Sequence, residues 1–143
     1  MDFSLKRIRM KSINYEVIFE SFTERHFIRT FAKKYKGAWD ITQRIITEEF
    51  RQIDLLFLKN AAEYITDKNA DIAIFKTEFK IAGTQVSRHS SGNRCIVAIH
   101  KNANKVCVLL VYYKTDLGGG SETGNWKSLV RENYPEYSNI LSN

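Results

Sequence analysis

The stretch from Asn104 to Lys114, NKVCVLLVYYK, constrains the fold more than any other part of the chain. It is apolar at consecutive positions, so a strand formed here would bury both of its faces. Such a strand lies in the interior of a sheet, with further layers packed on each side. We therefore expect a central strand over 105–114, covered on both faces by the rest of the chain.

The segment DIAIFKTEFKIAG, which starts at Asp71, has a period of two. One face carries Phe75, Phe79 and Ile81, whereas the other ends in the charged residues Lys76, Glu78 and Lys80. Two further strands are expected over 13–22 and 94–100, and KNAN (101–104) reads as a hairpin turn between 94–100 and 105–114. These strands predict a small, mainly antiparallel sheet.

Apolar residues at three- and four-residue steps predict helices over about 23–36, 41–60 and 122–133. Gly37 ends the first helix, Asp40 with Gln43 caps the second, and GAWD joins the two into a hairpin. Whether the second helix continues through AAEYI (61–65) is left open by Asn60. The expected order is β-α-α-β-β-β-α, an α+β fold whose helix hairpin covers the face with Phe75, Phe79 and Ile81.

The composition indicates one domain over 1–143 with a basic N-terminal extension over about 1–12. The formal net charge of +6 favours a polyanionic partner, because Lys and Arg bind phosphates. No apolar run is long enough for a membrane span and no signal-peptide core is present, so we expect a cytoplasmic protein without a membrane partner. Cys95 and Cys107 lie in apolar strands, which predicts buried, reduced thiols.

Basic side chains gather near one end of the predicted sheet. Lys80 ends one strand and Arg94 opens the next, so the two are expected to be cross-strand neighbours. Lys114 returns to the same end after the KNAN turn. We expect Lys80, Arg94 and Lys114 to converge, with Arg94 exposed and its guanidinium directed outward at a phosphate. The alternative is a solvated sheet edge on which lysines discourage aggregation. The expected placement of Cys95, Cys107 and His100 does not support a metal site.

The segments IAIFKTEFK, SSGNRCIVAI and VCVLLVYYK, in this order after an aromatic helix hairpin, resemble the RelE/ParE superfamily of bacterial toxins. The resemblance covers about residues 13–134. It implies a toxin of a toxin–antitoxin pair that cleaves messenger RNA in the ribosomal A site by acid–base catalysis, without a metal or other cofactor. The 2′-hydroxyl attacks the neighbouring phosphate and the 5′-oxygen leaves. The implied partners are an antitoxin protein, the ribosome and mRNA.

The resemblance also assigns residues. The implied catalytic residues are Lys76, Lys80, Arg94 and Lys114, and the implied RNA-binding residues are Arg88, His89, Tyr113 and Trp126, the last two as aromatics that stack a base. The loop from Gly83 to Asn93 is longer than in compact members, and KTDLGGGSETGNW follows the central strand where the family often has Arg, His or Tyr, so the general acid is unassigned. A ParE-like toxin that does not cut RNA, and a basic interaction module, are the alternatives.

Overall fold

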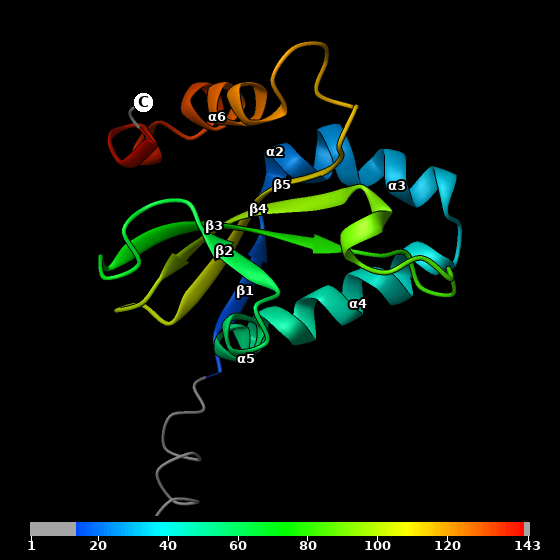
Figure 1. Cartoon of the computed structure of the whole chain (residues 1–143), viewed down its shortest axis with the longest axis horizontal. Coiled ribbons are helices and arrows are strands. Elements are labelled where there is room, and N and C mark those ends of the chain that lie inside the picture. The colour runs from blue at the N-terminus through cyan, green and yellow to red at the C-terminus, as the bar shows by residue number, and fades with distance from the viewer. Residues whose placement is uncertain (1–13, 142–143) are drawn as a thin grey trace, which may run out of the picture.

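The computed structural model describes residues 14–141, and the predicted N-terminal extension lies outside that range. At its centre is a five-stranded open sheet in the order β1-β5-β4-β3-β2 (Figure 1). β1 is parallel to β5, and the other pairs are antiparallel. The strands are β1 (Glu16–Phe19), β2 (Ala62–Tyr64), β3 (Ile72–Phe79), β4 (Asn93–His100) and β5 (Lys105–Tyr113). The fold is α+β with a mixed, mostly antiparallel sheet.

Four helices accompany the sheet within the described residues. The first helix is continuous but contains a π-helical turn, and the others are α-helical. Their bounds are α2 (Ser21–Thr23), the π turn (Glu24–Ile28) and α3 (Arg29–Lys34) for the first helix, then α4 (Ala38–Arg51), α5 (Ile53–Leu58) and α6 (Glu122–Asn133). Among residues 14–141, no helix is both long enough and apolar enough to cross a membrane.

The prediction of a central strand over 105–114 is confirmed by β5, which lies between β1 and β4. Residues 106 to 112 are all buried. The side chains of β5 divide between two apolar clusters, one on each face of the sheet: Val106, Val108 and Val111 belong to the first, and Cys107, Leu109, Leu110 and Tyr112 to the second. Burial on both faces explains why this segment is apolar at consecutive positions.

α4 and α5 cover the sheet face that was predicted to lie under helices. Phe75, Phe79 and Ile81 are at most 4% exposed. The ring of Phe50 meets Phe75 edge-on at a centroid distance of 6.1 Å, and Trp39 meets Phe79 at 6.0 Å. The predicted register of β3 is therefore confirmed, because a shift of one residue would have turned these rings to the opposite face.

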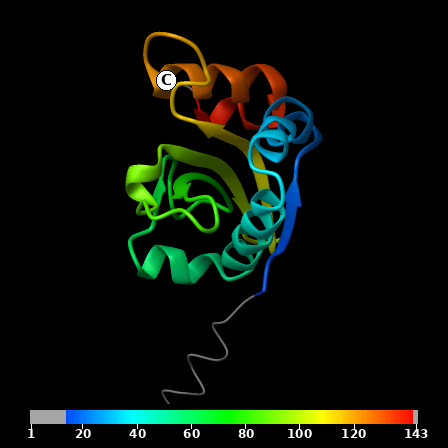
Figure 2. The ribbon, with the colours of Figure 1, turned by 90° about the vertical axis from the view of Figure 1, so that its right-hand side faces the viewer.

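α6 covers the opposite face, as the edge-on view in Figure 2 shows. Its bounds match the predicted helix, 122–133, and Pro135 follows its end. Trp126 and Val130 are fully buried against the sheet. The sheet is thus enclosed between α4–α5 on one side and α6 on the other.

The first helix differs from the prediction of a simple hairpin on one face. It follows β1 along the sheet edge (Figure 2) and contributes to both clusters, Phe31 to the first and Phe22 to the second. β1 pairs only with the first half of β5. Beyond that point, Thr23 Oγ1 accepts a hydrogen bond of 3.0 Å from the Val111 N–H. The helix therefore satisfies a donor of β5 that would otherwise be unpaired at a buried edge.

Two boundaries correct the sequence-based assignment. α4 begins at Ala38 with Gly37 as its N-cap residue, so most of GAWD is helical and Asp40 is not the cap. The predicted order lacks β2, because the segment left open after Asn60 is a short edge strand rather than a helical extension. Asn60 has a φ of 58°, a left-handed conformation that ends α5.

The predicted burial of both cysteines is confirmed, and they lie on opposite faces of the sheet.

Candidate functional site

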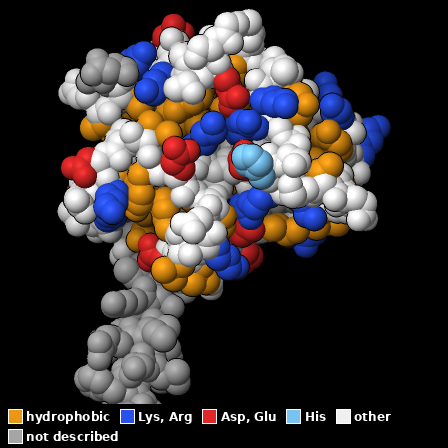
Figure 3. All heavy atoms as spheres, viewed as in Figure 1, with side chains coloured by type: hydrophobic (Ala, Val, Ile, Leu, Met, Phe, Trp, Pro, Cys, Tyr) orange, Lys and Arg blue, Asp and Glu red, His pale blue; other side chains and the backbone are white. Residues whose placement is uncertain are grey.

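A hollow of about 320 Å³ opens beside β2, β3 and the start of β4. Its charged and titratable lining residues are Glu63, Lys76, Glu78, His89 and Arg94. Figure 3 shows basic, acidic and histidine side chains next to one another at the centre of this face of the molecule. Groups of both charges that meet in a concave surface are the first place to look for a binding or catalytic site.

Arg94 lies where three strands run side by side. It is opposite Glu78 on β3 and opposite Tyr112 on β5. Because directly opposite residues share a sheet face, these three side chains project to the α6 side. Lys76 points to the same side from β3, two residues before Glu78. Register alone therefore brings two cations, a carboxylate and a phenol together.

The side chain that organises this group is Glu122, the first residue of α6. Its Oε2 lies 2.7 Å from Arg94 Nε and 3.8 Å from Lys76 Nζ. Tyr112 donates its hydroxyl to the same oxygen at 2.8 Å. Glu122 is placed here because Ser121 caps α6, its Oγ accepting a hydrogen bond from the Gly124 N–H. This carboxylate was not among the site residues predicted from the sequence.

The Arg94 side chain is less exposed than expected, and two of its nitrogen atoms lack a hydrogen-bond partner among the described residues. Its side chain is only 16% exposed, so the prediction of an exposed guanidinium is wrong. Nε is within ion-pair distance of Glu122 but its N–H does not form an aligned hydrogen bond, and buried Nη1 has no hydrogen-bond partner among the described residues. Buried donors without acceptors are rare in folded proteins. Arg94 thus retains capacity for another acceptor oxygen.

Tyr112 is a donor in this group and not an acid. Its side chain is fully buried. Burial first, and then the hydrogen bond to Glu122, raise the pKa of its hydroxyl far above the usual value. The phenol therefore remains protonated at every physiological pH and continues to donate to whatever anion lies in front of it.

A second pair lies on the other rim of the hollow. His89 Nδ1 is 3.0 Å from Glu78 Oε1, and the His89 side chain is 88% exposed. A carboxylate that holds one ring nitrogen fixes the orientation of an imidazole and leaves the other nitrogen free for a ligand. His89 is thus held at the mouth of the hollow in an arrangement suited to proton transfer.

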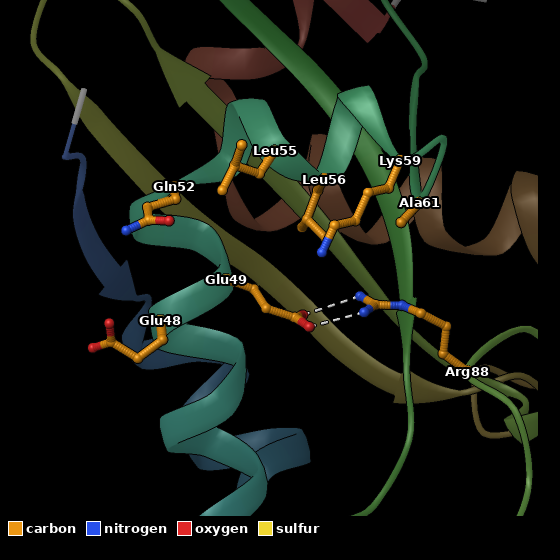
Figure 4. A pocket seen from close by; sticks show the side chains of 8 residues that line it. All are labelled: Glu48, Glu49, Gln52, Leu55, Leu56, Lys59, Ala61 and Arg88. Atoms are coloured by element: carbon orange, nitrogen blue, oxygen red, sulfur yellow. Dashed lines mark hydrogen bonds and ion pairs between the residues drawn. The ribbon is translucent and has the colours of Figure 1, made fainter. Parts of the chain in front are cut away.

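Arg88, predicted to bind RNA, is engaged within the protein. Its guanidinium makes a two-pronged contact with Glu49 on α4, at 2.9 and 3.1 Å, and its Nε donates to the Glu78 carbonyl at 2.8 Å. Figure 4 shows the Glu49 pair across a separate hollow of about 470 Å³ between α4, α5 and the loop. Arg88 ties the loop before β4 to α4, and thereby supports the position of His89.

The expected convergence of Lys80, Arg94 and Lys114 is not found. β3 ends at Phe79, and exposed Lys80 lines a different hollow together with α4 residues such as Thr42 and Ile46. Lys114 is exposed beyond the end of β5 and is tied by its backbone N–H to the Gly92 carbonyl. Of the four implied catalytic residues, only Lys76 and Arg94 come together.

The two implied stacking residues have different environments. Trp126 is 0% exposed, so it is part of the core and presents no ring to a base. Its Nε1 is buried without a hydrogen-bond partner among residues 14–141. Tyr113 is 37% exposed and lines a small hollow with Lys34 and Tyr35 at the end of α3. Only Tyr113 is therefore available to an outside ligand.

Glu122, Glu78 and Tyr112 are the members of the site that sequence reasoning missed. The position of Glu122 next to the Ser121 cap could have directed attention to it, because a first-turn acid is fixed by its helix. Within residues 14–141, no group of three or more His, Cys, Asp or Glu is arranged to hold a metal ion. Comparison of the chain with protein-family models, curated proteins and solved structures gives no match.

Proposed function

We propose that this protein is a ribosome-dependent endoribonuclease and the toxin of a toxin–antitoxin pair, as its RelE-like sequence pattern implies. The observation that carries the proposal is the convergence of Arg94, Lys76 and Tyr112 on one carboxylate oxygen. Donors arranged around one anionic oxygen can equally hold an oxygen of a phosphodiester. The proposed targets are ribosome-bound mRNA in the cytoplasm, and the proposed regulator is an antitoxin protein.

In this proposal Arg94 and Lys76 hold the non-bridging oxygens of the scissile phosphate. Their charge matters most when the phosphorus becomes five-coordinate and negative charge accumulates on those oxygens. The unpartnered Nη1 of Arg94 supplies a further donor for that state. Strands β3 and β4 fix both cations, so little reorganisation is needed during the reaction.

Proton transfer is assigned to His89 and Lys76. His89, oriented by Glu78, takes the proton of the 2′-hydroxyl, and the 2′-oxygen attacks the phosphorus. The bond from phosphorus to the 5′-oxygen breaks, and Lys76 gives a proton to that leaving oxygen. The products are a 2′,3′-cyclic phosphate and a 5′-hydroxyl end. Solvent returns the proton to Lys76 and removes it from His89.

The test is cleavage of mRNA on purified ribosomes, in the presence of a chelator, followed by primer extension. Wild-type protein should cut within the A-site codon. Arg94→Ala and His89→Gln should each reduce the rate by roughly a hundredfold or more, as the loss of one charge donor or proton carrier does elsewhere. Arg94→Lys, which retains the charge and the packing stem, should recover part of the loss.

The matched control is Lys80→Ala, because Lys80 is an exposed lysine just beyond the end of β3 and lines a different hollow. This variant should cut within about twofold of wild type. An inactive wild-type protein, or a folded Arg94→Ala or His89→Gln variant with full activity, would refute the proposal. Circular dichroism of each variant establishes that the fold is retained.

A binding module without catalysis is the second candidate, and one observation favours it. The site is nearly neutral rather than strongly positive, because acidic side chains in and around the hollow offset its basic and histidine side chains. The acids are Glu63, Glu78 and Glu122, and the side chains that they offset are Lys76, Arg94 and His89. Much of the net charge of +6 instead belongs to residues 1–13, which contain four basic residues and one acid. Ribosome binding that depends on this segment, with no RNA cut by wild type, would support this candidate.

A further inference from the structure

Glu122 contacts the cations of the hollow as a bound anion would. One of its oxygens, Oε2, meets Arg94 from β4, Lys76 from β3 and Tyr112 from β5. Glu122 itself comes from outside the sheet, at the start of α6. The three donors therefore form a site on the sheet, and the carboxylate is an occupant delivered by another element.

The donors need an anion in this position. The side chains of Arg94 and Lys76 are only 16% and 24% exposed, so water screens their mutual repulsion poorly. A carboxylate oxygen and a phosphate oxygen accept the same charge-assisted hydrogen bonds at the same distances. Because Glu122 occupies the donors, a phosphate can bind to them only after that carboxylate has moved away.

The surroundings of Glu122 permit such a movement. Its side chain is 26% exposed and borders solvent. The preceding loop contains three consecutive glycines, and two of them, Gly118 and Gly120, have φ values of 100° and 87°. The Asn125 side chain donates hydrogen bonds to the Gly119 and Gly118 carbonyls of this loop, at 3.0 and 3.4 Å. The rest of α6 is fixed by buried Trp126 and Val130, so the first turn can shift while the helix stays in place.

We propose that Glu122 is an internal phosphate mimic that holds the Lys76–Arg94–Tyr112 site closed, and that an RNA phosphodiester displaces it on binding. The proposal rests on the proposed function for the identity of the ligand. It makes Glu122 a self-inhibitory residue rather than a catalytic base. Removal of its charge should consequently strengthen substrate binding, the opposite of what removal of a catalytic group does.

The test uses a fluorescent RNA oligonucleotide in which every 2′-hydroxyl is methylated, so that it can bind but not react. Fluorescence anisotropy gives the dissociation constant for wild type and for Glu122→Gln, which keeps the shape and an acceptor for Tyr112 but removes the charge. Glu122→Gln should bind roughly tenfold or more tightly, because a negative charge no longer faces the incoming phosphate. The matched control is Glu132→Gln, which removes the charge of an exposed acid near the other end of α6 and outside the hollow, with an expected change within about twofold.

Inorganic phosphate provides a second readout that does not depend on RNA. It should raise the melting temperature of Glu122→Gln more than that of wild type, because ligand binding to the folded state stabilises it. Unchanged or weaker binding of both probes by folded Glu122→Gln would overturn the inference. If Glu122→Gln instead binds with wild-type affinity but no longer cuts RNA that wild type cuts, Glu122 is catalytic and only the proposed function stands. Tighter binding without RNA cleavage by any variant would uphold the inference and refute the proposed function.

Discussion

Arg88→Ala is the substitution that best separates a structural role from RNA binding. Wild-type Arg88 makes two charged hydrogen bonds to Glu49 and one to the Glu78 carbonyl. The side chains of this ion pair are 30% and 29% exposed, so the pair is half-buried. Its contribution should therefore lie between that of surface ion pairs, which is less than ~1 kcal/mol, and the cost of breaking a buried pair, which is ~3–5 kcal/mol. We expect Arg88→Ala to lower the free energy of unfolding by about 2 kcal/mol.

Thermal unfolding followed by circular dichroism measures this loss. An unfolding entropy of about 2.1 cal/mol/K per residue gives about 0.3 kcal/mol/K for the whole chain, so the melting temperature should fall by about 7 °C. A double-mutant cycle with Glu49→Ala should give a coupling energy of about 1–2 kcal/mol. Lys80→Ala, at an exposed lysine, should change the melting temperature by less than about 2 °C.

The same variant should leave the salt dependence of RNA binding unchanged. A residue that contacts one phosphate of single-stranded RNA contributes about 0.7 to the slope of log K against log salt concentration. If Arg88→Ala melts like wild type and reduces this slope by about that amount, Arg88 binds RNA and the structural reasoning is wrong.

Three further predictions concern the fold. Gly92→Ala should cost about 1 kcal/mol or more in chemical denaturation, because φ is 80° and the new methyl would lie 2.6 Å from a tyrosine ring, whereas Gly119→Ala, with open space around it, should be nearly neutral. Cys95 and Cys107 should react with a thiol reagent at pH 8 only after unfolding, since burial raises both thiol pKa values, that of Cys107 to about 11. Burial lowers the pKa of His100, so the stability that depends on neutral His100 is complete above the unfolded-state pKa of about 6.5 and is lost as the pH falls below it. His100→Gln should therefore reduce the loss of stability on acidification below about pH 6.5.

The core of the fold could be predicted from the sequence because burial leaves a strong pattern. The consecutive apolar residues of β5 and the alternation around Phe75 in β3 each have one arrangement that hides them from water. The bounds of α6 were also predicted, since Pro135 gives a clear stop and the helical apolar spacing a clear start. β2 was missed because three residues at a sheet edge are too short for any period to be visible.

The site was predicted only in part, for a physical reason. Strand order placed Arg94 near the lysines of β3, and register determines that Lys76 rather than Lys80 accompanies it. Reasoning from cations alone could not find Glu122, because its place depends on how the loop after β5 brings the start of α6 back over the sheet. Contacts between distant segments set the pairing of charges, whereas sequence spacing reports only neighbours on one element.

If the hollow around Arg94 cuts RNA by attack of a 2′-hydroxyl, two ribosome-bound mRNAs that differ at one atom should give different results. The cleavage site of wild type is mapped first, and the second mRNA is then made with a 2′-deoxy nucleotide on the 5′ side of that bond. We expect the all-ribose mRNA to be cut to a 2′,3′-cyclic phosphate and a 5′-hydroxyl, and the deoxy mRNA to stay intact. Cleavage of both mRNAs, a 5′-phosphate product, or no cleavage of either would contradict it.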